Sequence, residues 1–200
     1  MKTKEQNKLV DKVVEQLRQT AIDLEEFQVQ MALGKAEALD KYEEIKKTFN
    51  LFIHDSQHKI NEGKEKLTEL HTKFDELIVQ LALGKAESKE VFIEQKKKLL
   101  LKLHDLEVSI KTNKTLNSMY AFLLIEIEKF KIQLEALEQK FDKNKEDVKH
   151  TFENAKKEFN TVVEKIKAKY SSEPEETQWE HFQNEISEAF GHFRNAFSKV

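Results

Sequence analysis

Two stretches of the chain contain the Gly-Lys pair of a phosphate-binding loop. They read Leu-Gly-Lys-Ala at residues 33–36 and again at residues 83–86. A phosphate loop also needs a Gly five residues before this one, a Ser or Thr after the Lys, and a preceding strand. Here Val29 and Val79 stand in place of that earlier Gly, Ala follows each Lys, and both flanks have a helical pattern. The sequence therefore predicts no phosphate site in either stretch.

Three neighbouring side chains could bind a metal ion. His54 and His58 have the i, i+4 spacing that lets two imidazoles share one ion on a helix, and Asp55 lies between them. No Glu stands in the arrangement found in zinc proteases, and no further ligands can be assigned. Because these residues fall in a segment rich in turn formers, we favour a solvated turn, and we predict neither a metal nor a cofactor.

Carboxylates are abundant but do not form a catalytic pair. The 37 Asp and Glu residues are interspersed with 34 Lys and Arg. Glu43 with Lys47 and Glu94 with Lys98 are i, i+4 pairs, which support a helix by about 0.2–0.5 kcal/mol each. No carboxylate lies in an apolar setting that favours acid–base catalysis, and without Cys there is no thiol nucleophile. We therefore expect a protein that is not an enzyme.

Charge and composition exclude other classes of function. The net charge is −3 with both signs mixed along the chain, so no basic stripe is available for nucleic acid. The longest apolar run, residues 121–125, is too short to span a bilayer. The absence of Cys fits a reducing compartment, and no apolar segment follows the amino terminus. We expect a cytoplasmic protein.

The elements that carry these residues are helices. Good helix formers dominate, with only four Gly and one Pro, and 14 Phe at helical spacing argue against disorder. Residues 29–37 and 79–87 are identical except for Met31 against Leu81. This offset of 50 residues predicts a duplicated unit, about 9–58 and 59–108.

Apolar stripes of helical period predict an all-α fold. We expect an elongated antiparallel helical bundle or coiled-coil hairpin of three long helices within residues 1–170, the third at about 114–170. A reversal near residue 59 would pair the two repeats; the alternative is a continuous helix paired with another chain. In the hairpin, small residues would let two backbones approach closely at mid-helix. These residues are Gly34, Ala38, Gly84 and Ser88.

A fainter third copy of the unit is suggested by one shared pattern. Residues 42–49 and 152–159 both read aromatic-Glu-x-x-Lys-Lys-x-Phe. The sequence alone leaves open whether this likeness reflects descent or chance.

The carboxyl-terminal segment is distinctive. Residues 171–178 form an acidic linker with Pro174, and Thr177 with Glu180 has capping-box spacing. A short amphipathic helix at 179–200 then carries an aromatic face. This face comprises Trp179, Phe182, Ile186, Phe190, Phe193 and Phe197. It could fold back on the bundle, anchor a partner protein or lie on a membrane surface, and its acidic residues count against the membrane.

The repeat, the acidic linker and the aromatic tail behind a Lys/Glu-rich hairpin resemble a family of small bacterial coiled-coil proteins often labelled stress-response proteins. This resemblance implies a cytoplasmic helical protein without catalytic residues.

These observations predict a function class. We expect a non-catalytic scaffold or protein–protein interaction module, and the family resemblance suggests a role in a stress response. Such a module would bind a protein partner or self-associate, with the aromatic tail as its candidate docking face. The alternative is an amphipathic protein that binds a lipid or granule surface.

Overall fold

The computed structural model describes residues 3–31, 35–61, 67–142, 148–170 and 174–198. Within these ranges the chain forms seven α-helices and two short 3-10 turns, and no β-strand. The all-α fold class is therefore confirmed. The helices are α1 (Thr3–Met31), α2 (Lys35–Asn61), α3 (Thr68–Leu81), α4 (Lys89–Lys111), α5 (Asn117–Asp142), α6 (Val148–Lys169) and α7 (Trp179–Ser198), with the turns η1 (Lys114–Leu116) and η2 (Glu176–Gln178).

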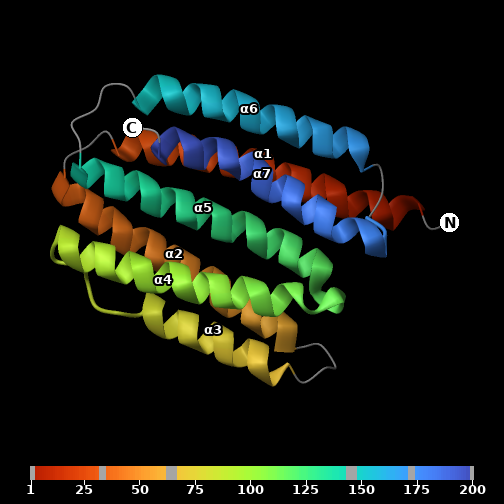
Figure 1. Ribbon diagram of the computed structural model, residues 1–200, viewed down its shortest axis with the longest axis horizontal. Helices are drawn as coiled ribbons and strands as arrows, with labels where there is room; N and C mark the ends of the chain where they lie inside the picture. Colours follow the sequence, from red (N-terminus) through yellow and green to blue (C-terminus); the bar gives the residue numbers. More distant parts are fainter. Residues whose placement is uncertain (1–2, 32–34, 62–66, 143–147, 171–173, 199–200) are drawn as a thin grey trace.

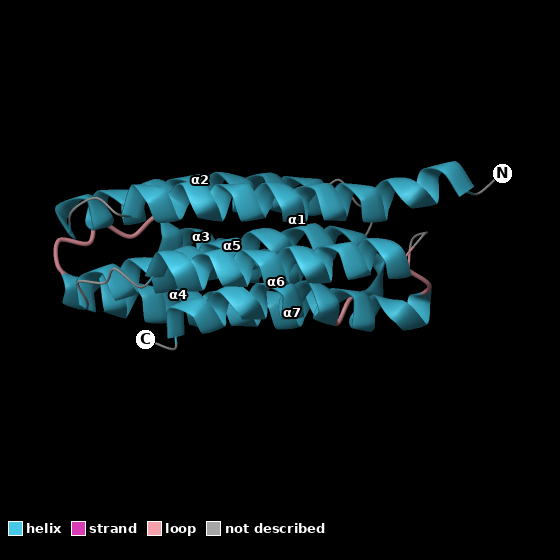
Figure 2. Ribbon diagram, turned by 90° about the horizontal axis from the view of Figure 1, so that it is seen from above, coloured by secondary structure: helices cyan, strands magenta, loops and turns pink. Residues whose placement is uncertain are grey.

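The helices form an up-and-down bundle. Each helix runs antiparallel to the one before it, so the amino terminus and the carboxyl end of α7 lie at opposite ends (Figure 1). Seen from above, α1 and α2 lie along one face of the molecule and α4 and α7 along the other (Figure 2). The bundle is about as long as its individual helices.

Two four-helix groups share one helix, α5. In the first group α2 packs on α3, α3 on α4, and both α4 and α2 on α5. In the second group α1 packs on α6, α6 on α7, and both α7 and α1 on α5. The shared helix therefore joins the groups into one body, since its opposite sides belong to two different cores.

This position explains the unusual composition of α5. A helix with neighbours on all sides must be apolar nearly all round. Eleven apolar side chains of α5 are buried, and they occur on consecutive positions as well as at helical spacing. They are Tyr120, Ala121, Leu123, Leu124, Ile125, Ile127, Phe130, Ile132, Leu134, Ala136 and Leu137.

In the two copies of the duplicated unit, the helices end at equivalent positions. The first helix of each unit ends at Met31 or Leu81, and the second ends at Asn61 or Lys111. Both pairs differ by the same 50 residues that separate the two copies in the sequence. Each copy of the duplicated unit is therefore a pair of consecutive antiparallel helices, α1–α2 in the first copy and α3–α4 in the second, of which α3 and α4 pack on each other.

The fainter third copy has a matching place in the fold. Phe152 and Phe159 are buried on α6, as Tyr42 and Phe49 are on α2. The pair α5–α6 is thus a third pair of consecutive antiparallel helices with aromatic residues at similar positions. Burial at this spacing is expected on any amphipathic helix, so descent and chance both stay open for the shared pattern.

The predicted three long helices are replaced by six, because the chain also reverses within the repeats. Residues 82–88 between α3 and α4 are not helical. Ser88 instead caps α4, accepting a hydrogen bond from the backbone N of Val91 at 3.3 Å. Near residue 59, where a reversal was predicted, α2 ends at Asn61 and packs antiparallel to α3.

The connection between α3 and α4 is held by side chains of neighbouring helices. The carbonyl of Leu83 accepts from Lys46 Nζ at 3.0 Å, and the carbonyl of Gly84 accepts from Gln95 Nε2 at 2.9 Å. The backbone N of Ala86 donates to Glu43 Oε1 at 3.2 Å. A non-helical segment can persist here because its backbone polar groups find partners in the tertiary structure.

The predicted close approach of small residues at mid-helix is not formed. Gly84 lies in the connection, and a Cβ placed on it would meet nothing within 4 Å. Ala38 is buried near the start of α2, Ser88 is a helix cap, and Gly34 lies outside the described residues. The two repeats do meet, at the end of the bundle, where Lys85 Nζ pairs with Asp40 Oδ1 at 2.6 Å.

Candidate functional site

The aromatic face predicted as a docking surface is buried in the bundle. Its six side chains are each 8% exposed or less, because α7 packs against α6 and α5. The structure corrects the prediction that this face is a docking surface, because the face forms part of the core. The structure thus selects the fold-back interpretation from the three that the sequence left open.

Aromatic rings fix α7 in this position. Phe159 on α6 contacts Phe190 and Phe193 with ring centroids 5.1 and 5.0 Å apart. At the other end of the helix pair, the rings of Tyr170 and Phe182 meet edge to face at 4.8 Å. Such contacts add about 0.5–1.5 kcal/mol each to the burial of the rings. The tail is therefore an integral helix of the second group.

The turn before α7 also differs in detail from the prediction. The side chain of Gln178 accepts a hydrogen bond from the backbone N of Glu175 at 3.1 Å. The cap thus forms at Glu175 and Gln178, two residues before the predicted pair Thr177 and Glu180.

The histidine cluster lies on the solvent-exposed surface of α2, within the helix rather than in the predicted turn. His54, Asp55 and His58 are all exposed, and Asp55 Oδ2 pairs with Lys59 Nζ at 2.6 Å. Over the described part of the chain, no group of three or more His, Asp or Glu gathers in a way that could hold a metal ion. The same part contains no helix that could cross a membrane.

The two predicted i, i+4 ion pairs have different outcomes. Glu94 and Lys98 on α4 pair at 2.7 Å, as predicted. Glu43 pairs with Lys46 at 3.1 Å rather than with Lys47. The buried Lys46 takes this partner because it also reaches the connection between α3 and α4, which Glu43 binds as well.

A groove runs between α1 and α2. Both helices pack on α5, but they belong to different four-helix groups and do not pack closely on each other. The space left between them is a cavity of about 260 Å³ above α5. It is lined by Asp23, Glu26, Phe27 and Gln30 of α1, by Lys41, Glu44, Ile45, Thr48, Phe49 and Phe52 of α2, and by Glu126, Lys129, Phe130 and Gln133 of α5.

A second hollow continues this groove toward the first repeat. It has a volume of about 430 Å³ and shares Gln30, Lys41 and Glu44 with the first. Its other lining residues are Met31, Glu37, Ala38 and Asp40. We refer to the two hollows together as the α1–α2 groove.

Aromatic rings lie at the floor of the groove, where Phe52 is partly buried and Phe49 and Phe130 are 4% and 1% exposed. Phe49 of α2 and Phe130 of α5 stack with ring centroids 4.2 Å apart and planes 7° from parallel. Phe52 extends the stack, with its ring 6.1 Å from that of Phe49. Ile22 and Val29 on α1 and Leu51 on α2 are exposed large apolar side chains on the same two helices, at 45%, 68% and 64%. Exposed apolar side chains are thus present on both helices that form the groove.

The walls of the groove are acidic. Six carboxylates line it against two lysines. The carboxylates are Asp23, Glu26, Glu37, Asp40, Glu44 and Glu126, and the lysines are Lys41 and Lys129. Both lysines are already engaged, Lys41 with Glu44 at 2.8 Å and Lys129 with Glu126 at 2.9 Å. Within the described residues, Glu26 and Glu37 have no ion pair, so the groove has an uncompensated negative charge.

Lys129 lies at the base of the acidic wall. Burial disfavours its charged form, but the carboxylates of Glu126 and Asp23 outweigh burial and raise the pKa of Lys129 above its ordinary value. Asp23 lies 3.2 Å from its Nζ, and Glu126 also accepts a hydrogen bond from Gln16 Nε2 at 3.0 Å. This network links α1 to α5 and holds the lysine protonated.

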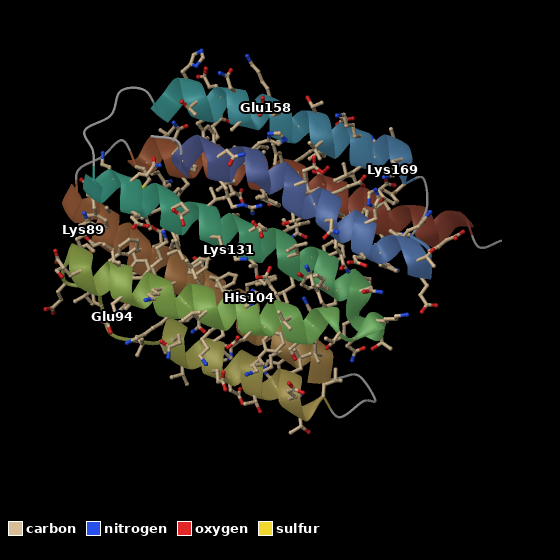
Figure 3. The ribbon with its side chains drawn as sticks, in the orientation of Figure 1. Lys89, Glu94, His104, Lys131, Glu158 and Lys169 are labelled. Carbon is tan, nitrogen blue, oxygen red and sulfur yellow. The ribbon has the colours of Figure 1, made fainter. Side chains whose placement is uncertain are left out.

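On the opposite side of α5, ion pairs connect this helix to α4 and α7. There Glu107 of α4 binds Lys131 of α5 at 2.8 Å, and Lys131 lies 3.6 Å from Glu128. Glu128 in turn binds Arg194 of α7. Lys131 is seen between α4 and α5 in Figure 3. The two sides of α5 therefore differ. Paired side chains span the space between α4 and α7, whereas the space between α1 and α2 stays open.

The arrangement in the groove suits binding. It combines an aromatic floor, a rim of carboxylates, and amide or hydroxyl groups of Gln30, Thr48 and Gln133. Sequence reasoning missed these residues because it placed α1 and α2 on one continuous helix, where residues 23–30 and 41–52 cannot face each other. The available signal was the apolar composition of α5, which requires neighbours on all its sides.

Comparisons of this chain with protein-family models, with curated proteins and with solved structures found no match. The site is therefore interpreted from its own geometry.

Proposed function

We propose that this protein is a non-catalytic interaction module that binds a cationic amphipathic helix of a partner protein in the α1–α2 groove. The observation that carries the proposal is the open groove between two antiparallel helices, with the partly buried Phe52 on its floor next to the buried stack of Phe49 and Phe130. Proteins recognise amphipathic helices by placing the apolar face of the helix in such a groove.

The charge of the groove supports a basic partner. Six carboxylates line it against two lysines, and both lysines have partners. Complementary charge raises the association rate and excludes partners of the wrong sign. A helix with Leu or Phe on one side and Lys or Arg on its flanks matches both the floor and the walls.

The binding of designed peptides tests this proposal. One peptide of about 20 residues carries Leu at i, i+3, i+4 and i+7 with Lys between, and its match carries Glu in place of Lys. Fluorescence anisotropy at low salt should show at least about tenfold tighter binding of the Lys peptide. Absence of binding, or equal binding of the two peptides, would overturn the proposal.

Charge-reversal variants test whether the peptide binds in the α1–α2 groove. Glu26→Lys combined with Glu37→Lys should weaken binding of the Lys peptide about tenfold, because both carboxylates lie at the groove. The matched control is Glu153→Lys with Glu188→Lys, which makes the same charge change at exposed positions of α6 and α7. Equal weakening by both pairs would mean that net charge, rather than the groove, attracts the peptide.

Binding to a lipid or granule surface is the alternative hypothesis. It requires the helices to separate, because the apolar stripes are buried in the two cores. Co-sedimentation with anionic and neutral vesicles distinguishes it: retention on vesicles with exposure of the Trp179 fluorophore would favour this alternative over the groove.

A further inference from the structure

One helix has apolar side chains on its outer face. On α4, Leu99, Leu103 and Leu106 point into the first group and are fully buried. A second stripe runs along the outside, and we call it the α4 stripe. It consists of Ile93, Lys97, Leu100, Leu101, His104 and Val108. Ile93 is 37% exposed, Leu101 57% and Val108 49%, so the stripe presents apolar surface along more than half of α4.

The α4 stripe is hollowed at its centre. A cavity of about 350 Å³ is lined by Ile93, Leu100 and Leu101 together with Lys96, Lys97 and Glu138. Lys96 is buried and binds Glu135 and Glu138 of α5. Figure 3 shows Glu94 and His104 along α4, which passes in front of α2 in this view. An apolar side chain from a neighbouring molecule could enter this hollow.

The order of residues along the stripe is self-complementary. If two α4 helices cross antiparallel about a point between Leu100 and Leu101, Ile93 of each faces Val108 of the other. Glu90 of each then faces Lys111 of the other, with opposite charges. In a parallel pair, by contrast, Glu90, Lys97 and Lys111 would each face their own copy. The symmetric antiparallel arrangement is therefore favoured, because it pairs the apolar side chains and brings Glu90 to Lys111, while Lys97 of each copy faces His104 of the other.

We propose that two copies of this chain associate through their α4 stripes about a two-fold axis between Leu100 and Leu101. This inference is independent of the proposed function, because the α4 stripe shares no residue with the α1–α2 groove, and α4 lies on the face of the bundle opposite to α1 and α2 (Figure 2). A dimer of this kind leaves both grooves open and directed away from the interface. It would then bind two partner helices at once and gain affinity for paired targets.

Solution mass tests the association. Light scattering on a sizing column should give a mass that rises with concentration from the 23.6 kDa of one chain toward twice that value. Leu101→Asp should abolish the rise, since it places a charge at the two-fold axis. Val79→Asp is the matched control, because Val79 is 60% exposed on α3 and lies off the stripe. One chain mass at every concentration, or equal loss of the dimer in both variants, would overturn the proposal.

Disulfide trapping tests the direction of the helices, and the chain has no Cys of its own to interfere. Leu101→Cys should cross-link to its own copy. Ile93→Cys should not, because 93 and its copy would lie about 22 Å apart along the helix at ~1.5 Å per residue. A mixture of Ile93→Cys and Val108→Cys chains should form the mixed disulfide. Efficient self-cross-linking of Ile93→Cys would show a parallel pair and overturn the two-fold arrangement.

Discussion

Phe49 of α2 and Phe130 of α5 stack nearly parallel, with their ring centroids 4.2 Å apart. This contact joins the shared helix to the first four-helix group and forms the floor of the α1–α2 groove at the same time. A single ring pair thus serves both stability and the candidate site. Variants at these positions must therefore be separated into effects on folding and effects on binding.

Phe130→Ala should destabilise the protein by about 3–5 kcal/mol, because it removes a ring that is 1% exposed and leaves a cavity in the shared helix. Urea unfolding followed by circular dichroism measures the change. Leu51→Ala is the control, since Leu51 is exposed beside the groove and its loss should cost less than about 0.5 kcal/mol. A Phe130→Ala protein as stable as the parent would contradict the buried position of this ring.

Gly84→Ala should leave the free energy of unfolding unchanged or raise it by up to about 1 kcal/mol. A Cβ at this position meets no atom within 4 Å, and no described glycine has a positive φ. Alanine also reduces the freedom of the unfolded chain. Thermal and urea unfolding measure the effect. A loss of more than about 1 kcal/mol would support the close helix approach that the sequence had suggested for this glycine.

Phe190→Ala should destabilise the protein by about 3–5 kcal/mol, because Phe190 is fully buried against Phe159. Denaturant unfolding measures this change, and Asn195→Ala, at an exposed position of the same helix, is the control. If Phe190→Ala left stability unchanged but abolished capture of a partner, α7 would instead be a free docking helix.

Glu76→Gln should reduce the dependence of stability on acid pH. The hydrogen bond from Lys102 Nζ, at 2.8 Å across α3 and α4, lowers the pKa of Glu76 from its ordinary value of 4.5. Because the folded pKa is the lower one, the stabilisation is fully present above pH 4.5 and is lost as the pH falls through the folded pKa.

Urea unfolding of the parent and of Glu76→Gln at a series of pH values measures this effect. The parent should be the more stable at pH 7, and the difference should disappear in acid. Glu188→Gln, at an exposed position in the middle of α7, is the control and should change the free energy of unfolding by less than about 0.5 kcal/mol. A difference between parent and Glu76→Gln that persists in strong acid would mean that Gln disturbs packing rather than an ion pair.

The local pattern predicted the helices and their inward faces well. Phe74, Leu77 and Leu81 recur at helical spacing and are buried on α3, and the aromatic residues of α7 are buried on one side of that helix. Apolar side chains at this spacing must share a face whichever neighbour covers it. The 50-residue offset also carried real information, since it reappears as equal distances between helix ends.

The points at which helices end were decided by the tertiary structure. The chain leaves the helix after Leu81 because side chains from α2 and α4, among them Lys46 and Gln95, bind the carbonyls of the connection. These partners are 11 or more residues away in sequence, and no local propensity reveals them. Continuing the helix would have removed α4 from α5 and left the apolar stripes of both helices exposed.

What the sequence by itself determined is which residues turn inward, because hydrophobic burial depends on the spacing of apolar side chains along each helix. Only the tertiary structure decided which helix covers which face. It placed the aromatic tail on α6 and α5, and it assigned α1 and α2 to different groups on either side of the shared helix. The groove arises from that assignment, because two helices that pack on a common third helix need not fill the space between them.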